Sequence, residues 1–88
     1  MKGKRDDNRA VALHYTESLP APLVVASGRG AVAEAIRRIA RENGVPVVAD
    51  PDLSASLLEL DPGSLIPESL YEVVAELLVF VRGLSRAQ

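Results

Sequence analysis

The spacing of apolar residues changes from strand-like to helix-like along the first half of the chain. Residues 10–15 alternate loosely, which favours a short strand. Leu23–Ala26 is a continuous apolar run, typical of a strand covered on both faces. Between these two segments, Glu17–Pro22 is polar and interrupted by proline, so it predicts a turn.

An amphipathic helix is predicted after the second apolar run. Residues 27–30 (Ser-Gly-Arg-Gly) end the run, and apolar residues then recur at i, i+4, i+7 and i+8. These positions share one helical face: Val32, Ile36, Ile39 and Ala40. Asn43 and Gly44 supply a left-handed stop, and Val45–Ala49 is another apolar run of strand type. The order strand, helix, strand predicts a parallel βαβ unit with a right-handed crossover.

The second half of the chain predicts two further helices. Asp50 and Pro51 are suited to the N-cap and the first position of a short helix that runs to about Leu58. Pro67 opens the last helix, in which one buried stripe is expected: Leu70, Val74, Leu77 and Val81. The predicted fold class is therefore α/β, with a small mixed sheet of about three strands flanked by about three helices.

Composition limits the chain to one small domain. Its 88 residues, 48% of them apolar, suffice for a single core. The expected organisation is a disordered segment at residues 1–8, a domain at 9–84 and a tail at 85–88. Met1 leads into charged residues, and the longest apolar run, Leu77–Val81, is far below the roughly 20 residues that span a bilayer. These features predict a cytoplasmic protein.

Candidate chemistry is sparse. The chain has no cysteine and a single histidine, His14, so we expect no metal site, no cofactor and no catalytic dyad. The net charge of −2 argues against a general nucleic-acid binder. Arg37, Arg38 and Arg41 fit a solvated helix face. The turn at Gly28–Gly30 precedes a helix and leaves open a small nucleotide- or anion-binding domain, although it matches no complete phosphate-loop motif.

Five segments, in this order, resemble one known family. They are the AVAL strand, the APLVVASG strand and turn, the IRRIARENGVPVV block, the acidic-proline helix start, and the helix IPESLYEVVAELL. Over about Ala10–Leu84 the chain resembles the C-terminal cytoplasmic domain of the FlhB family, the substrate-specificity switch proteins of flagellar and type III secretion export. The resemblance implies the FlhB/YscU cytoplasmic-domain fold.

The reactive peptide of that family is degenerate here. Family members carry Asn-Pro-Thr-His before the strand and cut themselves when the Asn side chain attacks its own carbonyl and expels the proline nitrogen. The four positions here read Arg5, Asp6, Asp7 and Asn8, and no Asn-Pro pair occurs in the chain. The resemblance therefore implies a stand-alone, non-enzymatic relative of the post-cleavage half.

The function implied by the resemblance is protein–protein interaction at the export gate. In the family, the segment before the cut adds a strand beside the one that corresponds to residues 10–15. Without that segment, these residues should form an open edge for strand pairing: Ala10, Val11, Ala12, Leu13, His14 and Tyr15. Expected partners are a membrane-bound FlhB-type protein, other export components or their substrates. A homodimer formed through the edge strand remains an alternative.

Overall fold

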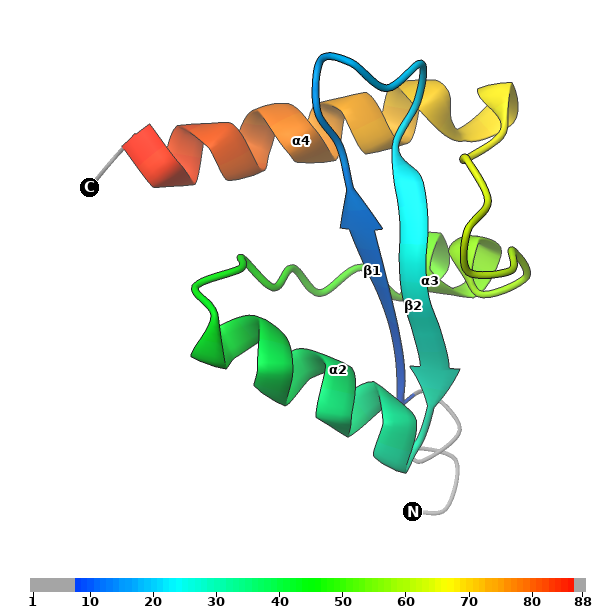
Figure 1. Cartoon of the computed structure of the whole chain (residues 1–88), viewed down its shortest axis with the longest axis vertical. Coiled ribbons are helices and arrows are strands. Elements are labelled where there is room, and N and C mark those ends of the chain that lie inside the picture. Colours follow the sequence, from blue (N-terminus) through cyan, green and yellow to red (C-terminus); the bar gives the residue numbers. More distant parts are fainter. Residues whose placement is uncertain (1–7, 87–88) are drawn as a thin grey trace.

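A computed structural model describes residues 8–86 of the chain. Two strands are followed by three α-helices, the last of which is preceded by a short 3-10 helix (Figure 1). In chain order the elements are β1 (Arg9–His14), β2 (Leu23–Arg29), α2 (Ala31–Glu42), α3 (Pro51–Leu57), η1 (Glu68–Leu70) and α4 (Tyr71–Arg86). The predicted α/β class is confirmed.

The sheet of the described chain is an antiparallel pair. Arg9 lies opposite Arg29 at one end of the ladder and His14 lies opposite Leu23 at the other, with an irregularity between Ala12 and Leu13. The outer edge of β2 is covered by residues 63–66. Two hydrogen bonds join Val24 to this segment: its amide donates to the carbonyl of Ser64 at 2.8 Å, and its carbonyl accepts from the amide of Gly63 at 2.7 Å.

The two faces of the sheet pack against different helices. Because side chains alternate along a strand, Val11 and Leu13 point to one face and Ala10 to the other. Val11 and Leu13 pack against the main core cluster, to which α3 and α4 also contribute. The cluster consists of Ala21, Val24, Leu53, Leu57, Ile66 and Val74. On the opposite face, a Cβ atom added to Gly28 would stand 2.7 Å from the Cβ of Val32. Only a glycine allows α2 to approach β2 this closely.

Local signals in the sequence placed several element ends correctly. The Asp50 carboxylate accepts a hydrogen bond from the Leu53 amide at 3.1 Å, so Asp50 caps α3 as predicted. Gly44 has a φ of 72° and follows the end of α2. The last helix differs slightly, because its first turn, Glu68–Leu70, is 3-10 rather than α.

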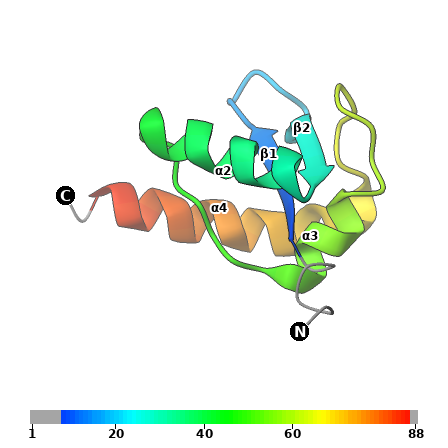
Figure 2. The ribbon, with the colours of Figure 1, turned by 90° about the horizontal axis from the view of Figure 1, so that it is seen from below.

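The predicted third strand and the parallel βαβ unit are wrong for the described residues. Val45–Ala49 is not assigned to a strand, and β2 pairs antiparallel with β1 instead of parallel with this segment. The physical reason is the position of the segments that lie beside β1 and β2. The outer edge of β2 is covered by residues 63–66. Val45–Ala49 runs past β1 on the side away from β2, and no described strand lies beside it (Figures 1 and 2).

Candidate functional site: the outer edge of β1

The hydrogen-bond phase of the β1–β2 ladder decides which backbone groups face outward. The amide of Gly30 donates to the carbonyl of Asn8 at 2.9 Å, directly across the ladder. Directly opposed residues in an antiparallel pair alternate between bonded and non-bonded pairs. Ala10 and Ala12 therefore direct their backbone groups toward β2, whereas Val11 directs its N–H and C=O away from it.

Leu13 is also turned outward, on the far side of the ladder irregularity. Its opposite residue, Val24, uses its amide and carbonyl to bond residues 63 and 64 on the outer side of β2. A residue whose partner bonds outward belongs to a non-bonded pair, so the backbone groups of Leu13 also point away from β2. Among the described residues no backbone partner meets Val11 or Leu13 on that side. We call this pair of outward-facing residues the free edge.

A side chain from α2 closes one end of the free edge. The Arg37 guanidinium donates from Nη1 to the carbonyl of Arg9 at 3.3 Å, and from Nη2 to Oδ1 of Asn8. The Asn8 amide in turn donates to the carbonyl of Gly30 at 3.2 Å. This network fixes the start of β1 against α2, so an incoming strand can pair only from Val11 onward.

Arg37 does not lie on a solvated face with Arg38 and Arg41, which is where the sequence predicted it. Of these three arginines, only Arg38 and Arg41 are exposed. Arg37 is half-buried and holds two neighbouring residues of the N-terminal strand. The signal that would have separated the three was weak, because Arg37 follows Ile36 and lies at the border of the apolar face.

The degenerate tetrapeptide lies mostly outside the described residues. Arg5, Asp6 and Asp7 precede the described chain, whereas Asn8 is described and is half-buried. Asn8 serves as an anchor: its carbonyl and both ends of its side-chain amide are hydrogen-bonded. It is followed by Arg9, so the bond after it has no proline nitrogen as leaving group.

The structure gives the Gly28–Gly30 turn little capacity to hold an anion. The amide of Gly30 is already bonded to the carbonyl of Asn8. Glu34 lies in the first turn of α2, and its Oε2 accepts from the Asn8 amide at 3.4 Å. A carboxylate at this helix start repels the phosphate groups that a nucleotide would bring there.

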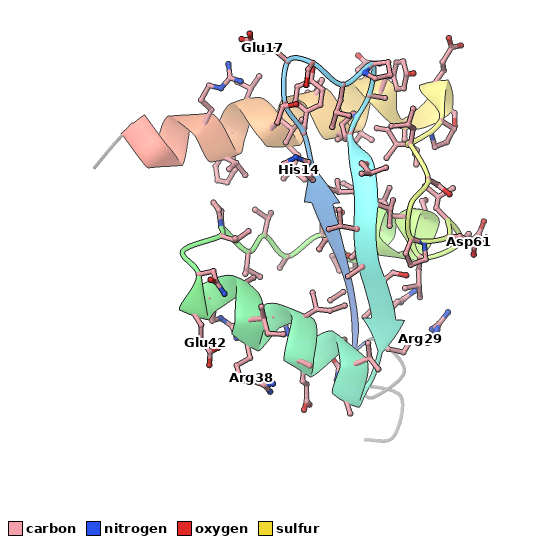
Figure 3. The ribbon with its side chains drawn as sticks, in the orientation of Figure 1. His14, Glu17, Arg29, Arg38, Glu42 and Asp61 are labelled. Atoms are coloured by element: carbon pink, nitrogen blue, oxygen red, sulfur yellow. The ribbon has the colours of Figure 1, made fainter. Side chains whose placement is uncertain are left out.

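Ionisable side chains are spread around the molecule rather than gathered in one place. His14 is exposed at the end of β1. In Figure 3 the carboxylates of Glu17, Glu42 and Asp61 extend from three separate parts of the chain and none of them approaches His14. The described residues labelled there therefore form no acid–base pair.

An apolar groove lies between the β1–β2 loop and α4. The sequence did not predict it. Its volume is about 310 Å³. It is lined by Tyr15, Pro20, Ala21, Pro22, Tyr71, Ala75, Leu78, Val79 and Arg82. Val79 is 70% exposed and both tyrosines are more than two-fifths exposed. The groove has the shape and chemistry to accept an apolar side chain, and the only hint in the sequence was the broad apolar surface of the last helix.

Comparison with known proteins identifies the family. The model of the FlhB HrpN YscU SpaS Family matches residues 7–81. The chain belongs to this family. A Bacillus subtilis protein, YlqH, is 43% identical over 82 residues, which are 92% of this chain and 88% of YlqH. The flagellar biosynthetic protein FlhB of Escherichia coli is 46% identical over 79 residues, which are 88% of this chain but 21% of FlhB.

Solved structures agree with this assignment. The cytoplasmic domain of FlhB from Shewanella putrefaciens superposes with a TM-score of 0.86 at 34% identity, covering 91% of this chain and 67% of that domain. A variant of the EscU/SpaS C-terminal domain superposes with a TM-score of 0.82 at 32% identity, covering 86% of this chain and 96% of that one. The fold is therefore that of FlhB-type cytoplasmic domains. None of the described helices has the length and hydropathy needed to cross a membrane.

Proposed function

We propose that this chain is a non-enzymatic interaction module of a flagellar or type III protein export apparatus, located in the cytoplasm and recruited to the membrane export gate. Family membership supports the role in export. The observation that supports the mode of action is the free edge of β1, where the outward backbone donors and acceptors of Val11 and Leu13 have no partner among residues 8–86. A strand from a partner would satisfy these groups and cover apolar surface in one step.

The proposed partner is the membrane-anchored half of an FlhB-type protein. The chain spans about a fifth of the FlhB relatives that it matches, so most of such a partner is not represented in it. The segment that ends at the cleavage asparagine in those proteins is, by the resemblance described above, a strand that lies beside the equivalent of β1. Supplied by another molecule, the same strand would fit the same edge.

The decisive variant is Val11→Pro. Because the Val11 N–H faces away from β2, proline at this position removes a donor needed by the partner without removing a β1–β2 hydrogen bond. Wild-type protein should co-purify with an FlhB truncated at its cleavage site and should partly restore swimming to a strain that carries the truncation. Val11→Pro should do neither, provided that circular dichroism shows a folded protein.

The matched control is Val11→Ala, which trims the side chain but keeps the donor, and it should retain most of the binding. Failure of the wild-type protein both to co-purify and to restore swimming would contradict the proposed function. Equal binding by wild type and Val11→Pro would support the proposed partner but would exclude strand pairing at the free edge.

A further inference from the structure

The outward face of α4 has a large apolar residue at its centre. Val74 is fully buried on the inward face of this helix, and Leu77 packs against the core beside it. Val79 lies on the opposite side, since successive helical residues are about 100° apart, and its side chain is 70% exposed. In Figure 1 the C-terminal half of α4 extends past β1. The middle of α4 therefore presents an exposed valine on a helix face that the described chain leaves uncovered.

Small residues stand on either side of Val79. Ala75, one turn before it, is exposed, and a glycine occupies position 83, one turn after it. Residues four positions apart share a helix face, so these two positions and Val79 form one row. Packed helices lie about 8–10 Å apart, and small residues in the contact allow the shorter distance. The row therefore suits close contact with a second helix.

Charges of opposite sign lie at equal distances from Val79. Glu76 is three residues before it and Arg82 is three residues after it, and both side chains are exposed. When two antiparallel helices cross at Val79, each residue is level with the residue that is equally far on the other side of Val79 in the second helix. Glu76 is then level with Arg82 of the second copy, and the same contact occurs twice.

We propose that two copies of this chain associate through α4 as an antiparallel, two-fold symmetric pair of helices that cross at Val79. In a two-fold interface, a residue i that contacts a residue j of the partner is matched by a j that contacts i. The sequence around Val79 meets this condition in charge, at Glu76 and Arg82, and in size, at positions 75 and 83. The interface lies on a different element from the free edge of β1, so the inference goes beyond the proposed function and does not depend on it.

Charge complementarity selects a second copy of this chain as the occupant. A helix laid across Val79 needs a cation level with Glu76 and a carboxylate level with Arg82, because like charges there would repel. The α4 helix of a second copy, run in the opposite direction, supplies both charges and covers Val79 with apolar surface. A contact between two single helices is a small interface, so we expect a dissociation constant on the order of 0.1 mM.

The lack of cysteine in the chain allows a site-specific test with Val79→Cys. The two introduced thiols would meet at the two-fold axis, where closely packed helices bring the Cα atoms within the range of about 4.4–6.8 Å that a disulfide requires. Under mild oxidation we expect disulfide-linked dimers to form at least tenfold faster than in Val45→Cys. Val45 is the matched control, because it is 51% exposed and lies outside α4. Equal rates would overturn the proposal.

Charge reversal provides a second readout, by sedimentation equilibrium of the full chain. Glu76→Arg and Arg82→Glu each place like charges level with one another, and each should raise the dissociation constant of the dimer at least tenfold. The double variant restores opposite charges and should return the constant to the wild-type value. Both residues are exposed, so all three variants should fold, which circular dichroism checks. A wild-type protein that stays monomeric up to about 1 mM, or a dimer that neither single variant weakens, would contradict the α4 interface.

Discussion

The Arg37 side chain helps to hold the first strand in place. Its guanidinium joins α2 to Asn8 and to the carbonyl of Arg9, two residues that begin the N-terminal strand. Charged donors make stronger hydrogen bonds than neutral ones. Here these bonds fix the position of the start of β1 relative to α2. A half-buried arginine of this kind stabilises the fold, in contrast to its exposed neighbour Arg38.

We expect Arg37→Ala to lower the free energy of unfolding by about 1.5 kcal/mol, because it leaves two acceptors without their charged donor. Arg38→Ala is the matched control and should stay within about 0.5 kcal/mol of wild type. Urea titration of both variants measures the difference. Equal stability of the two variants would mean that the Asn8 network contributes nothing in solution.

The surroundings of Asn8 also determine whether the chain can cut itself after this residue. Cyclisation of an asparagine with release of the next residue requires a good leaving group and a flexible backbone, and Asn8 is hydrogen-bonded through its carbonyl and side chain and precedes Arg9. We therefore expect the chain to remain intact during prolonged incubation at mildly alkaline pH. Intact-mass spectrometry would detect a cut, and a fragment that ends at Asn8 would contradict this expectation.

At the scale of elements, α4 shows how an apolar helix divides its surface. Val74 is fully buried, and Leu70, Leu77 and Leu78 pack against the core beside it. Tyr71 and Val79, by contrast, are exposed and line the groove. Burial is thus confirmed for Val74 of the predicted stripe. The neighbouring apolar face of the helix lines the groove instead.

Substitutions along α4 should follow this division. Leu77→Ala should lower the free energy of unfolding by about 2 kcal/mol, the low end for a core leucine, because Leu77 is only partly buried. Exposed Glu72→Ala should change it by no more than about 0.5 kcal/mol. Urea titrations compare the two, and similar losses would mean that the helix is rotated relative to this structure.

Elements whose signals are local were predictable from the sequence. The N-cap at Asp50, the stop at Gly44 and the first strand depend on neighbouring residues. The first two lie where the sequence placed them, and the strand predicted at residues 10–15 is found at Arg9–His14, so Tyr15 lies just beyond it. Val45–Ala49 has an equally strong local pattern, but forming a strand requires a partner supplied from elsewhere in space. Periodicity also could not reveal the Arg37 network or the α4 groove, because both join residues that are distant in the sequence.

At the scale of the whole molecule, the small core makes the exposed apolar surface costly in free energy. The buried cluster consists of Ala21, Val24, Leu53, Leu57, Ile66 and Val74, and a chain of this length buries a modest fraction of its surface. Large apolar residues remain exposed on α2 and on Val45–Ala49. A partner strand that covers them would add apolar burial to a fold that has little to spare, which links binding to stability by mass action.

The two edges of the sheet are unlike within residues 8–86, since residues 63–66 cover the outer side of β2 and leave β1 as the one described strand able to accept another. A sheet with two available edges can extend in both directions, which is how strand-to-strand contacts propagate into filaments. A sheet with one edge can be extended once and is then closed. Strand pairing on this domain should therefore end at one-to-one complexes and should not polymerise, however high the protein concentration.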